Sequence, residues 1–247
     1  MSPTQSISQP EVLTVASFHA AVLELAPAVA VFDCDGTLWS GDSGVGFMRW
    51  TIERGILSRS AIDQLDHRYR SYLRGEVSEL AICGEMVQIY QGLRESEMRA
   101  AAAEFFRARV EPNIFPELLA LTRDLEARGT QIWAVSSTCD WVVEEGASRF
   151  GIPASRVLSA HVAIQDGRVT NHLLDVPTDE FKVAALAHAC VAHPDAAFGN
   201  SIHDAAMLSA ANHAFPVNPS PELLVQATQQ GWPIFYPAAV AKAVAEK

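Results

Sequence analysis

Residues 28–37 read AVAVFDCDGT, and this stretch decides the fold. Its first five residues form a continuous apolar run without polar alternation, which predicts a strand buried on both faces. Asp33 and Asp35 follow directly, and Gly36 lets the backbone turn sharply beside a bound group. Two carboxylates at this spacing can divide nucleophilic attack or metal binding from proton transfer. The same residues would also suit an ordinary turn or helix cap.

Two later apolar runs repeat this arrangement and are each followed by a helical pattern. Residues 131–135 end at Ser136, and residues 196–198 end at Gly199 and Asn200. Buried strands that alternate with helices predict an α/β fold with a doubly wound, Rossmann-like parallel sheet. Ligands bind beyond the carboxyl ends of the strands in such sheets, so we expect the polar residues there to meet. A first helix is predicted over residues 11–26.

The segment after the first strand has a different character. It holds helical patterns over residues 44–55, 59–74, 77–91 and 95–109, with glycines between them and no buried β run. We therefore predict an α-helical bundle cap over residues 41–111, inserted into an α/β core that comprises residues 1–40 and 112–247. Further along, Asp166-Gly167 between β-prone runs predicts a hairpin. Pro216, Pro219 and Pro221 predict a loop.

Composition limits the partners. The chain has 18 basic and 29 acidic residues, a formal charge of −11, which argues against binding to nucleic acid or to an anionic membrane surface. No Lys or Arg occurs in the first 48 residues, so no secretory signal is expected. The four widely spaced cysteines predict buried, reduced thiols and a cytoplasmic location rather than zinc or disulfides. We expect a monomer or a homodimer.

Several later residues can complete a phosphate site. Hydroxyls of Ser136 and Ser137 can bind phosphoryl oxygens beside a helix N-terminus, or can simply cap that helix. Lys182, the first lysine of the chain, can neutralise a phosphate or lie on a solvated surface. Asp204 can bring a third carboxylate to the same sheet edge, or serve a loop.

In this order, the motifs Asp-x-Asp-Gly-Thr, strand-Ser, Lys and Gly-Asn-x-x-x-Asp resemble those of the haloacid dehalogenase superfamily. The resemblance spans about residues 28–217, and the helical insert is similar to the cap of the phosphoserine-phosphatase-like branch. It implies a phosphatase in which Asp33 attacks phosphorus to form an aspartyl-phosphate and Asp35 is the acid and base. Because dehalogenases of this superfamily lack the second aspartate, a phosphatase is favoured.

The resemblance also implies Mg²⁺ as cofactor and a small phosphorylated metabolite as substrate. It places the metal at Asp33, Asp35, Asn200 and Asp204, and the phosphoryl oxygens at Ser136, Ser137 and Lys182. Asn200 stands where many relatives have aspartate, so Asp204 is a candidate for the main acidic ligand. Phe181 stands where the family pattern favours a small residue.

Substrate contacts are less determined. Asp42 resembles the acidic residue that receives the substrate ammonium in phosphoserine phosphatases, but residues 75–93 lack the arginine that would bind a substrate carboxylate. Ten of the 15 arginines lie in residues 41–111. Arg68, Arg70 and Arg74 could bind the substrate, but a solvated helix face is favoured for them. Two alternatives stay open: a phospho-ligand-binding or regulatory protein with weak turnover, and a phosphotransferase to an acceptor hydroxyl.

Overall fold

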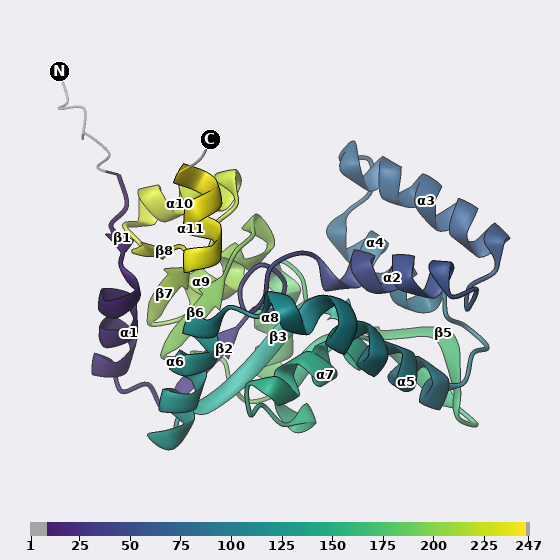
Figure 1. The fold of residues 1–247 in the computed structure, drawn as a ribbon, viewed down its shortest axis with the longest axis horizontal. Coiled ribbons are helices and arrows are strands. Elements are labelled where there is room, and N and C mark those ends of the chain that lie inside the picture. Colours follow the sequence, from purple (N-terminus) through teal and green to yellow (C-terminus); the bar gives the residue numbers. More distant parts are fainter. Residues whose placement is uncertain (1–8, 246–247) are drawn as a thin grey trace.

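A six-stranded sheet forms the centre of the computed structural model, which describes residues 9–245 (Figure 1). The strand order is β5-β4-β3-β2-β6-β7; β4 and β5 are antiparallel, and all other neighbours are parallel. The strands are β2 (Val29–Phe32), β3 (Gln131–Cys139), β4 (Val157–Gln165), β5 (Arg168–Asp175), β6 (Ala196–Gly199) and β7 (His213–Pro216). The predicted α/β fold with a doubly wound parallel sheet is therefore confirmed.

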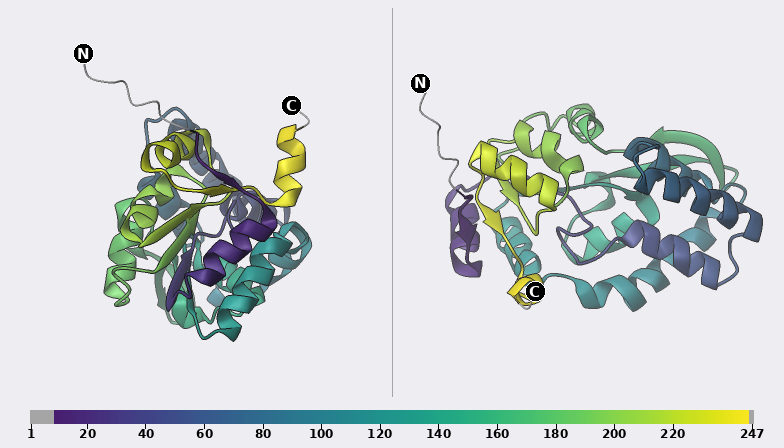
Figure 2. Two further views of the ribbon diagram at one scale, coloured as in Figure 1. Left: turned by 90° about the vertical axis from the view of Figure 1, so that its left-hand side faces the viewer. Right: turned by 90° about the horizontal axis from the view of Figure 1, so that it is seen from above.

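Helices cover both faces of the sheet, as expected from the apolar character of β2. Ala30 and Phe32 belong to a core with the helices of one face, whereas Val31 belongs to a second core on the other face. The first face carries α1 (Val15–Glu24), α6 (Pro116–Ala127) and α7 (Asp140–Arg149). The second carries α8 (Glu180–His188), α9 (Ala205–Ala210) and α10 (Pro221–Gln230), and Figure 2 shows both layers.

The start of the described chain differs from the prediction of one helix over 11–26. Val12–Leu13 form a short strand, β1, which pairs in parallel with β8 (Ile234–Phe235) ahead of the final helix α11 (Ala238–Ala245). Thr14 then caps α1 through a capping box with Ser17. The apolar spacing could not separate these elements, because the cap and the strand partner, not the periodicity, set the boundary.

Four helices lie between β2 and α6, as the sequence predicted. They are α2 (Ser43–Glu53), α3 (Arg59–Leu73), α4 (Glu79–Gln88) and α5 (Glu95–Phe105), followed by a π-helical turn (Phe106–Val110) and a 3₁₀ turn (Glu111–Asn113). Figure 1 shows α2, α3 and α4 at one end of the molecule, opposite α1, α10 and α11. Phe47 and Phe105 share one hydrophobic core with Trp141 and Val169. The cap boundaries at 41 and 111 stay a prediction.

The hairpin predicted at Asp166-Gly167 is confirmed, and it connects the insert to the sheet. Both turn residues have positive φ, 52° and 70°, which favours Asp-Gly at the turn of β4 and β5. Backbone N–H groups of Gly92 and Glu95 donate to the carbonyls of Val169 and Gly167 at 2.8 and 3.0 Å. The loop between α4 and α5 is thus hydrogen-bonded to the hairpin.

Three smaller expectations need correction. Strand β3 continues through Ser136 to Cys139, so the serines lie on the strand and not directly at the start of α7. Pro216 ends β7 and Pro221 begins α10, which confines the predicted loop to the residues between them. The four cysteines are free, but Cys190 is exposed. Within residues 9–245, no helix has the length and apolar character needed to span a membrane.

Gly146 is a packing point that a single methyl group should disturb. It lies on α7, and a Cβ there would come within 2.6 Å of aromatic carbons of both Trp39 and Phe106. We expect Gly146→Ala to lower the free energy of unfolding by about 1–3 kcal/mol in urea titrations, since overpacking a buried site costs this much. The exposed Ser148→Ala on the same helix should show no such loss. Equal stability of Gly146→Ala and wild type would contradict the packing argument.

Candidate active site

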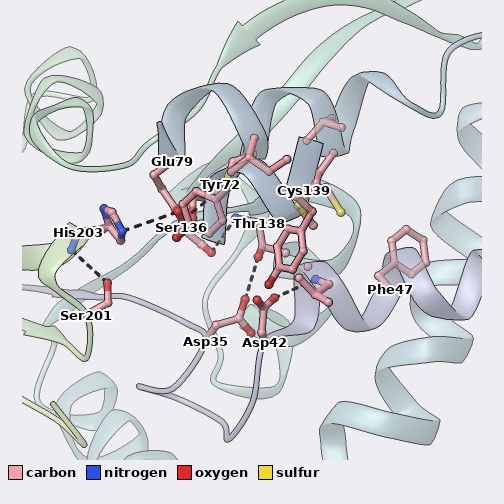
Figure 3. Close-up of a pocket in the computed structure, with 18 of the residues that line it drawn as sticks. Asp35, Asp42, Phe47, Tyr72, Glu79, Ser136, Thr138, Cys139, Ser201 and His203 are labelled. Carbon is pink, nitrogen blue, oxygen red and sulfur yellow. Dashed lines mark hydrogen bonds and ion pairs between the residues drawn. The ribbon is translucent and has the colours of Figure 1, made fainter. Parts of the chain in front are cut away.

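The candidate site lies beyond the carboxyl ends of β2, β3 and β6. Strand order reverses between β2 and β6, and the residues that follow these two strands flank the crevice where ligands bind in doubly wound sheets. A cavity of about 360 Å³ opens there. It is lined by every candidate site residue of the sequence except Asp204, namely Asp33, Asp35, Asp42, Ser136, Ser137, Lys182 and Asn200. Figure 3 shows part of its wall.

A buried ion-pair cluster forms the floor of the cavity. Lys182 Nζ donates to Asp33 Oδ1 at 2.7 Å, to Asp204 Oδ1 at 2.5 Å and to the carbonyl of Val135 at 3.0 Å. The three charged residues are each at most 7% exposed. Oδ2 of Asp33 accepts from the Thr37 hydroxyl at 3.0 Å. All three donor positions of the lysine are therefore occupied, by two carboxylates and by a carbonyl in the middle of β3.

The cluster carries more negative than positive charge, and the pKa values reflect this. Burial, followed by the charge of Asp204, raises the pKa of Asp33 to about 7, although Lys182 acts in the opposite direction. Burial alone would lower the pKa of Lys182, but the charges of Asp204 and Asp33 outweigh it and raise that pKa. Lys182 is consequently a permanent cation, and the floor is short of positive charge.

The side chain of Asp35 is held by three donors. Its Oδ1 accepts from Trp39 Nε1 at 2.6 Å and from the Ser43 backbone N–H, at the start of α2, at 2.8 Å. Its Oδ2 accepts from the Thr138 hydroxyl at 2.8 Å. Nitrogen donors fix Oδ1 as an acceptor, whereas a hydroxyl can either donate or accept. Oδ2 is therefore the oxygen that can carry a proton without losing a partner.

Fourth-motif residues are organised around Asp204. Its Oδ2 accepts from the backbone N–H groups of Asn200 and Ser201 at 2.8 and 2.9 Å. Both of its oxygens thus have protein partners. The amide side chain of Asn200 lines the cavity and forms no hydrogen bond with the described part of the chain. Ser136 is buried, and its Oγ accepts from the Thr138 N–H at 3.2 Å.

Gly36 permits the close approach of the first and fourth motifs. Its φ is +78°, and a Cβ would lie 1.9 Å from Nδ2 of Asn200. We expect Gly36→Ala to lower kcat/KM about 10²-fold in a phosphate-release assay, because misplacing a site residue by about 1 Å costs this much. Gly55→Ala is the matched control, since Gly55 has a similar φ of +67° and no atom of the described residues lies within 4 Å of the added Cβ. It should lose about 1 kcal/mol of stability from the backbone alone. Equal activity losses in both variants would show that the close approach of Gly36 to the Asn200 amide does not matter for activity.

Sequence reasoning missed three residues at the site. Trp39 and Thr138 fix Asp35, and Glu79 lines the cavity from the first turn of α4. Glu79 Oε2 lies 3.7 Å from His203 Nε2 (Figure 3). On its other side, His203 Nδ1 lies 2.8 Å from Asp179 Oδ1. In the sequence, Glu79 is simply an acidic residue in the first turn of a helix, directly after the Ser78 cap. Acidic residues are common there, so the position gave no sign of a role in the site.

Asp42 occupies a position at the mouth of the insert. It caps α2, where its Oδ1 accepts from the Val45 N–H at 2.8 Å. Burial, followed by the charge of Asp35 and more weakly that of Glu79, raises its pKa to about 6. This side of the cavity is also poor in positive charge.

The oxygen-rich floor fits a hard divalent cation. Carboxylate, amide and backbone carbonyl oxygens at Asp33, Asn200 and Asp35 are the ligand types that Mg²⁺ prefers. The raised pKa of Asp33 shows that Lys182 alone does not balance the carboxylates. Within residues 9–245, no group of three or more His, Cys, Asp or Glu side chains forms a metal cluster, so such a site would depend on the amide and carbonyl oxygens and on water.

Known proteins resemble the chain in sequence and in fold. Residues 30–209 match the haloacid dehalogenase-like hydrolase family. A histidinol-phosphatase of Neisseria meningitidis is 23% identical over 83% of this chain and 97% of its own length, and a probable phosphatase of Mycobacterium tuberculosis is 24% identical over 85% and 75%. A Bordetella pertussis protein of unknown function superposes with a TM-score of 0.75 at 23% identity, covering 84% of this chain and 97% of its own. Substrate-bound phosphoserine phosphatase gives a TM-score of 0.58 at 15% identity, covering 85% and 92%.

Proposed function

Since this chain belongs to the haloacid dehalogenase-like hydrolases, we propose that it is a Mg²⁺-dependent phosphatase that hydrolyses a small phosphomonoester through an aspartyl-phosphate on Asp33. Relatives named as phosphatases support the assignment as a phosphoric monoester hydrolase. The observation that carries the proposal is the pairing of Asp33 with Lys182 and Asp204 beside Asp35, at the switch point of the sheet.

In the first half of the reaction, a carboxylate oxygen of Asp33 attacks phosphorus and the bond from phosphorus to the alcohol oxygen breaks. Asp35 gives its Oδ2 proton to the departing alkoxide, while Trp39 and the Ser43 N–H keep Oδ1 in place. Thr138 follows the change, since its hydroxyl accepts from the protonated oxygen and donates to the ionised one.

In the second half, water attacks the phosphorus of the aspartyl-phosphate. Asp35, now ionised, takes a proton from that water, and the bond between phosphorus and the Asp33 oxygen breaks. Inorganic phosphate leaves, and both aspartates return to their starting states. One carboxyl group thus serves as acid and then as base.

Charge repulsion is the main barrier to attack by Asp33. Two unit charges about 4 Å apart cost about 4 kcal/mol at an effective dielectric of 20. A magnesium ion bound by Asp33, the Asp35 backbone carbonyl and Asn200 would supply positive charge to the phosphoryl oxygens. Asp204, a predicted ligand, would act mainly by orienting Lys182 and the Asn200 loop, because it does not line the cavity whereas Asp33 does. Lys182 holds Asp33 Oδ1, so Asp33 keeps one orientation before attack.

Phosphoryl oxygens would be held by groups at the end of β3. We assign this role to the hydroxyls of Ser136 and Ser137, which line the cavity beside Lys182. Asp42 faces the same cavity from the start of α2 and would contact the alcohol part of the substrate.

Hydrolysis of p-nitrophenyl phosphate tests the proposal. We expect phosphate release that requires added Mg²⁺ and stops in EDTA. Release no faster than that of the Asp33→Asn variant would sink the enzymatic assignment and favour a phospho-ligand-binding protein. Transfer of phosphate to added glycerol in place of water would instead identify a phosphotransferase.

A further inference from the structure

The walls of the cavity indicate which alcohol is released. We infer that the substrate is the phosphate ester of a small alcohol that carries a positively charged nitrogen and no carboxylate, and that Glu79 receives this nitrogen beside the subsite already expected at Asp42. The inference rests on the proposed function, because one cavity is lined both by Asp33 and by Glu79. The alcohol part of any phosphate held at Asp33 must therefore lie against the remaining walls.

The basic side chains that line the cavity within residues 9–245 already have partners. They are Lys182 and His203. Lys182 has three acceptors and faces two carboxylates, so none of its charge is left for the substrate's far end. His203 pairs with Asp179 at 2.8 Å and approaches Glu79 only at 3.7 Å.

Arginines of the insert do not supply the missing charge. No arginine in the described residues lines this cavity, which agrees with the solvated face favoured for Arg68, Arg70 and Arg74. Three arginines in the second half of α3 and at its C-terminus are paired with acids that do not line the cavity: Arg68 with Glu85 at 2.6 Å, Arg70 with Asp66 at 2.5 Å and Arg74 with Glu76 at 2.8 Å. A substrate carboxylate in this cavity would meet Asp42 and Glu79 in a lining that contains no arginine among the described residues.

The two acids, in contrast, have neutral hydrogen-bond donors but no close cation: Asp42 accepts from the Val45 N–H, and Glu79 accepts from the Cys83 thiol at 3.4 Å. The salt bridges among the described residues give Asp42 no basic partner and give Glu79 only the distant His203. Burial and neighbouring negative charge raise the pKa of Asp42 to about 6, so a cation at this point relieves repulsion that the folded chain does not relieve itself. The side chain of Glu79 is 14% exposed, which makes an ion pair there less screened than at the surface.

Aromatic and apolar side chains form the rest of this wall. Tyr69, Tyr72 and Tyr90 line the cavity together with Phe47. Burial, and then a hydrogen bond with Glu79, raise the pKa of Tyr72, which places its hydroxyl beside the acid. Aromatic rings attract cations through their π-electrons and repel anions. An acidic, aromatic wall in a cavity of about 360 Å³ suits a compact cationic group.

Three matched substrate series test the inference. They are ω-aminoalkyl, n-alkyl and ω-carboxyalkyl phosphates of two to five carbons, assayed with Mg²⁺ by phosphate release. We expect kcat/KM at the best chain length to be at least about tenfold higher for the amine than for the alkyl phosphate, and lowest for the carboxylate; tenfold corresponds to about 1.4 kcal/mol. Equal values for amine and alkyl phosphates would overturn the inference.

Variants locate the effect. Glu79→Gln keeps the shape of the side chain and should reduce the amine-to-alkyl ratio to about one or two. Glu85→Gln is the matched control, because it lies on the same helix and pairs with Arg68 outside the cavity. It should leave the ratio and both rates unchanged. A Glu79→Gln ratio equal to that of wild type would remove Glu79 from the assignment.

A binding measurement separates this inference from the proposed function. Calorimetric Kd values for 3-aminopropylphosphonate and propylphosphonate need no turnover, and we expect the amine to bind about tenfold more tightly. Amine preference in binding without any hydrolysis would refute the phosphatase assignment and keep the cationic subsite. If wild type hydrolyses amine and alkyl phosphates equally well and Asp33→Asn hydrolyses neither, the cationic subsite is refuted and the phosphatase assignment stands.

Discussion

Asp33→Asn should lower kcat for p-nitrophenyl phosphate by about 10⁴-fold or more, because removing a covalent nucleophile costs up to about 10⁶-fold in other hydrolases. The amide cannot form the proposed acyl phosphate, yet it has nearly the shape of the carboxylate. Its single oxygen can accept from Lys182, and its NH₂ group can donate to the Thr37 hydroxyl, which then acts as acceptor. Phosphate release over a range of enzyme concentrations measures the loss. Activity within tenfold of wild type would exclude Asp33 as nucleophile.

The same variant should be no less stable than wild type, which separates chemistry from unfolding. The folded-state pKa of Asp33 is raised to about 7, so its ionisation destabilises the metal-free protein. The stability that the protonated group contributes is present below about pH 4 and is lost as the pH rises through 7. In EDTA, urea titrations should therefore show the Asn variant gaining on wild type, on the order of a few kcal/mol, between these limits. A constant difference from pH 4 to 8 would contradict the raised pKa.

Lys182→Met should have the largest effect on stability. The substitution leaves Asp33 and Asp204 buried without their shared cation, while the methionine fills a similar volume. Removing one partner of a buried pair typically costs about 3–5 kcal/mol. Urea titration at pH 7.5 measures this loss, and circular dichroism shows whether the fold survives.

A second substitution provides the control. Asp204→Asn in the Lys182→Met background removes one of the facing charges and should recover about half or more of the lost stability, since an uncompensated buried charge is the dominant cost. Activity should not return, because Asp33 still lacks the ammonium that orients it. If the double variant is as unstable as the single one, the loss comes from packing and not from charge.

The strands and the helical insert were predictable because their signals are local. Val29–Phe32 is apolar at every position, since helices cover both faces, and each helix of the insert keeps its own apolar spacing. The end of β3 was harder to predict from the sequence. Ser136 to Cys139 are kept in the strand by pairing with β4, across a register shift that the residues themselves do not encode.

The floor of the site was predicted as a set of residues but not as a network. The motifs named Asp33, Lys182 and Asp204, and the structure brings both carboxylates within hydrogen-bonding distance of Lys182. The sequence did not indicate that the two Asp204 oxygens accept hydrogen bonds from Lys182 and from the Asn200 loop. These bonds depend on the conformation of the turn after β6. Glu79 and Thr138 were missed because their positions depend on how the insert packs against the sheet.

The place of β2 also determines when the site can form during synthesis. The chain carries Asp33 out of the ribosome before the whole helical insert, and β2 gains its first sheet neighbour only when β3 follows. The lysine that pairs with Asp33 lies 149 residues further along. Contacts of such sequence separation form late, after the local helices. A nascent chain released before α8 therefore has its nucleophile but no counter-ion, and the charge network closes only when the C-terminal half of the sheet has folded.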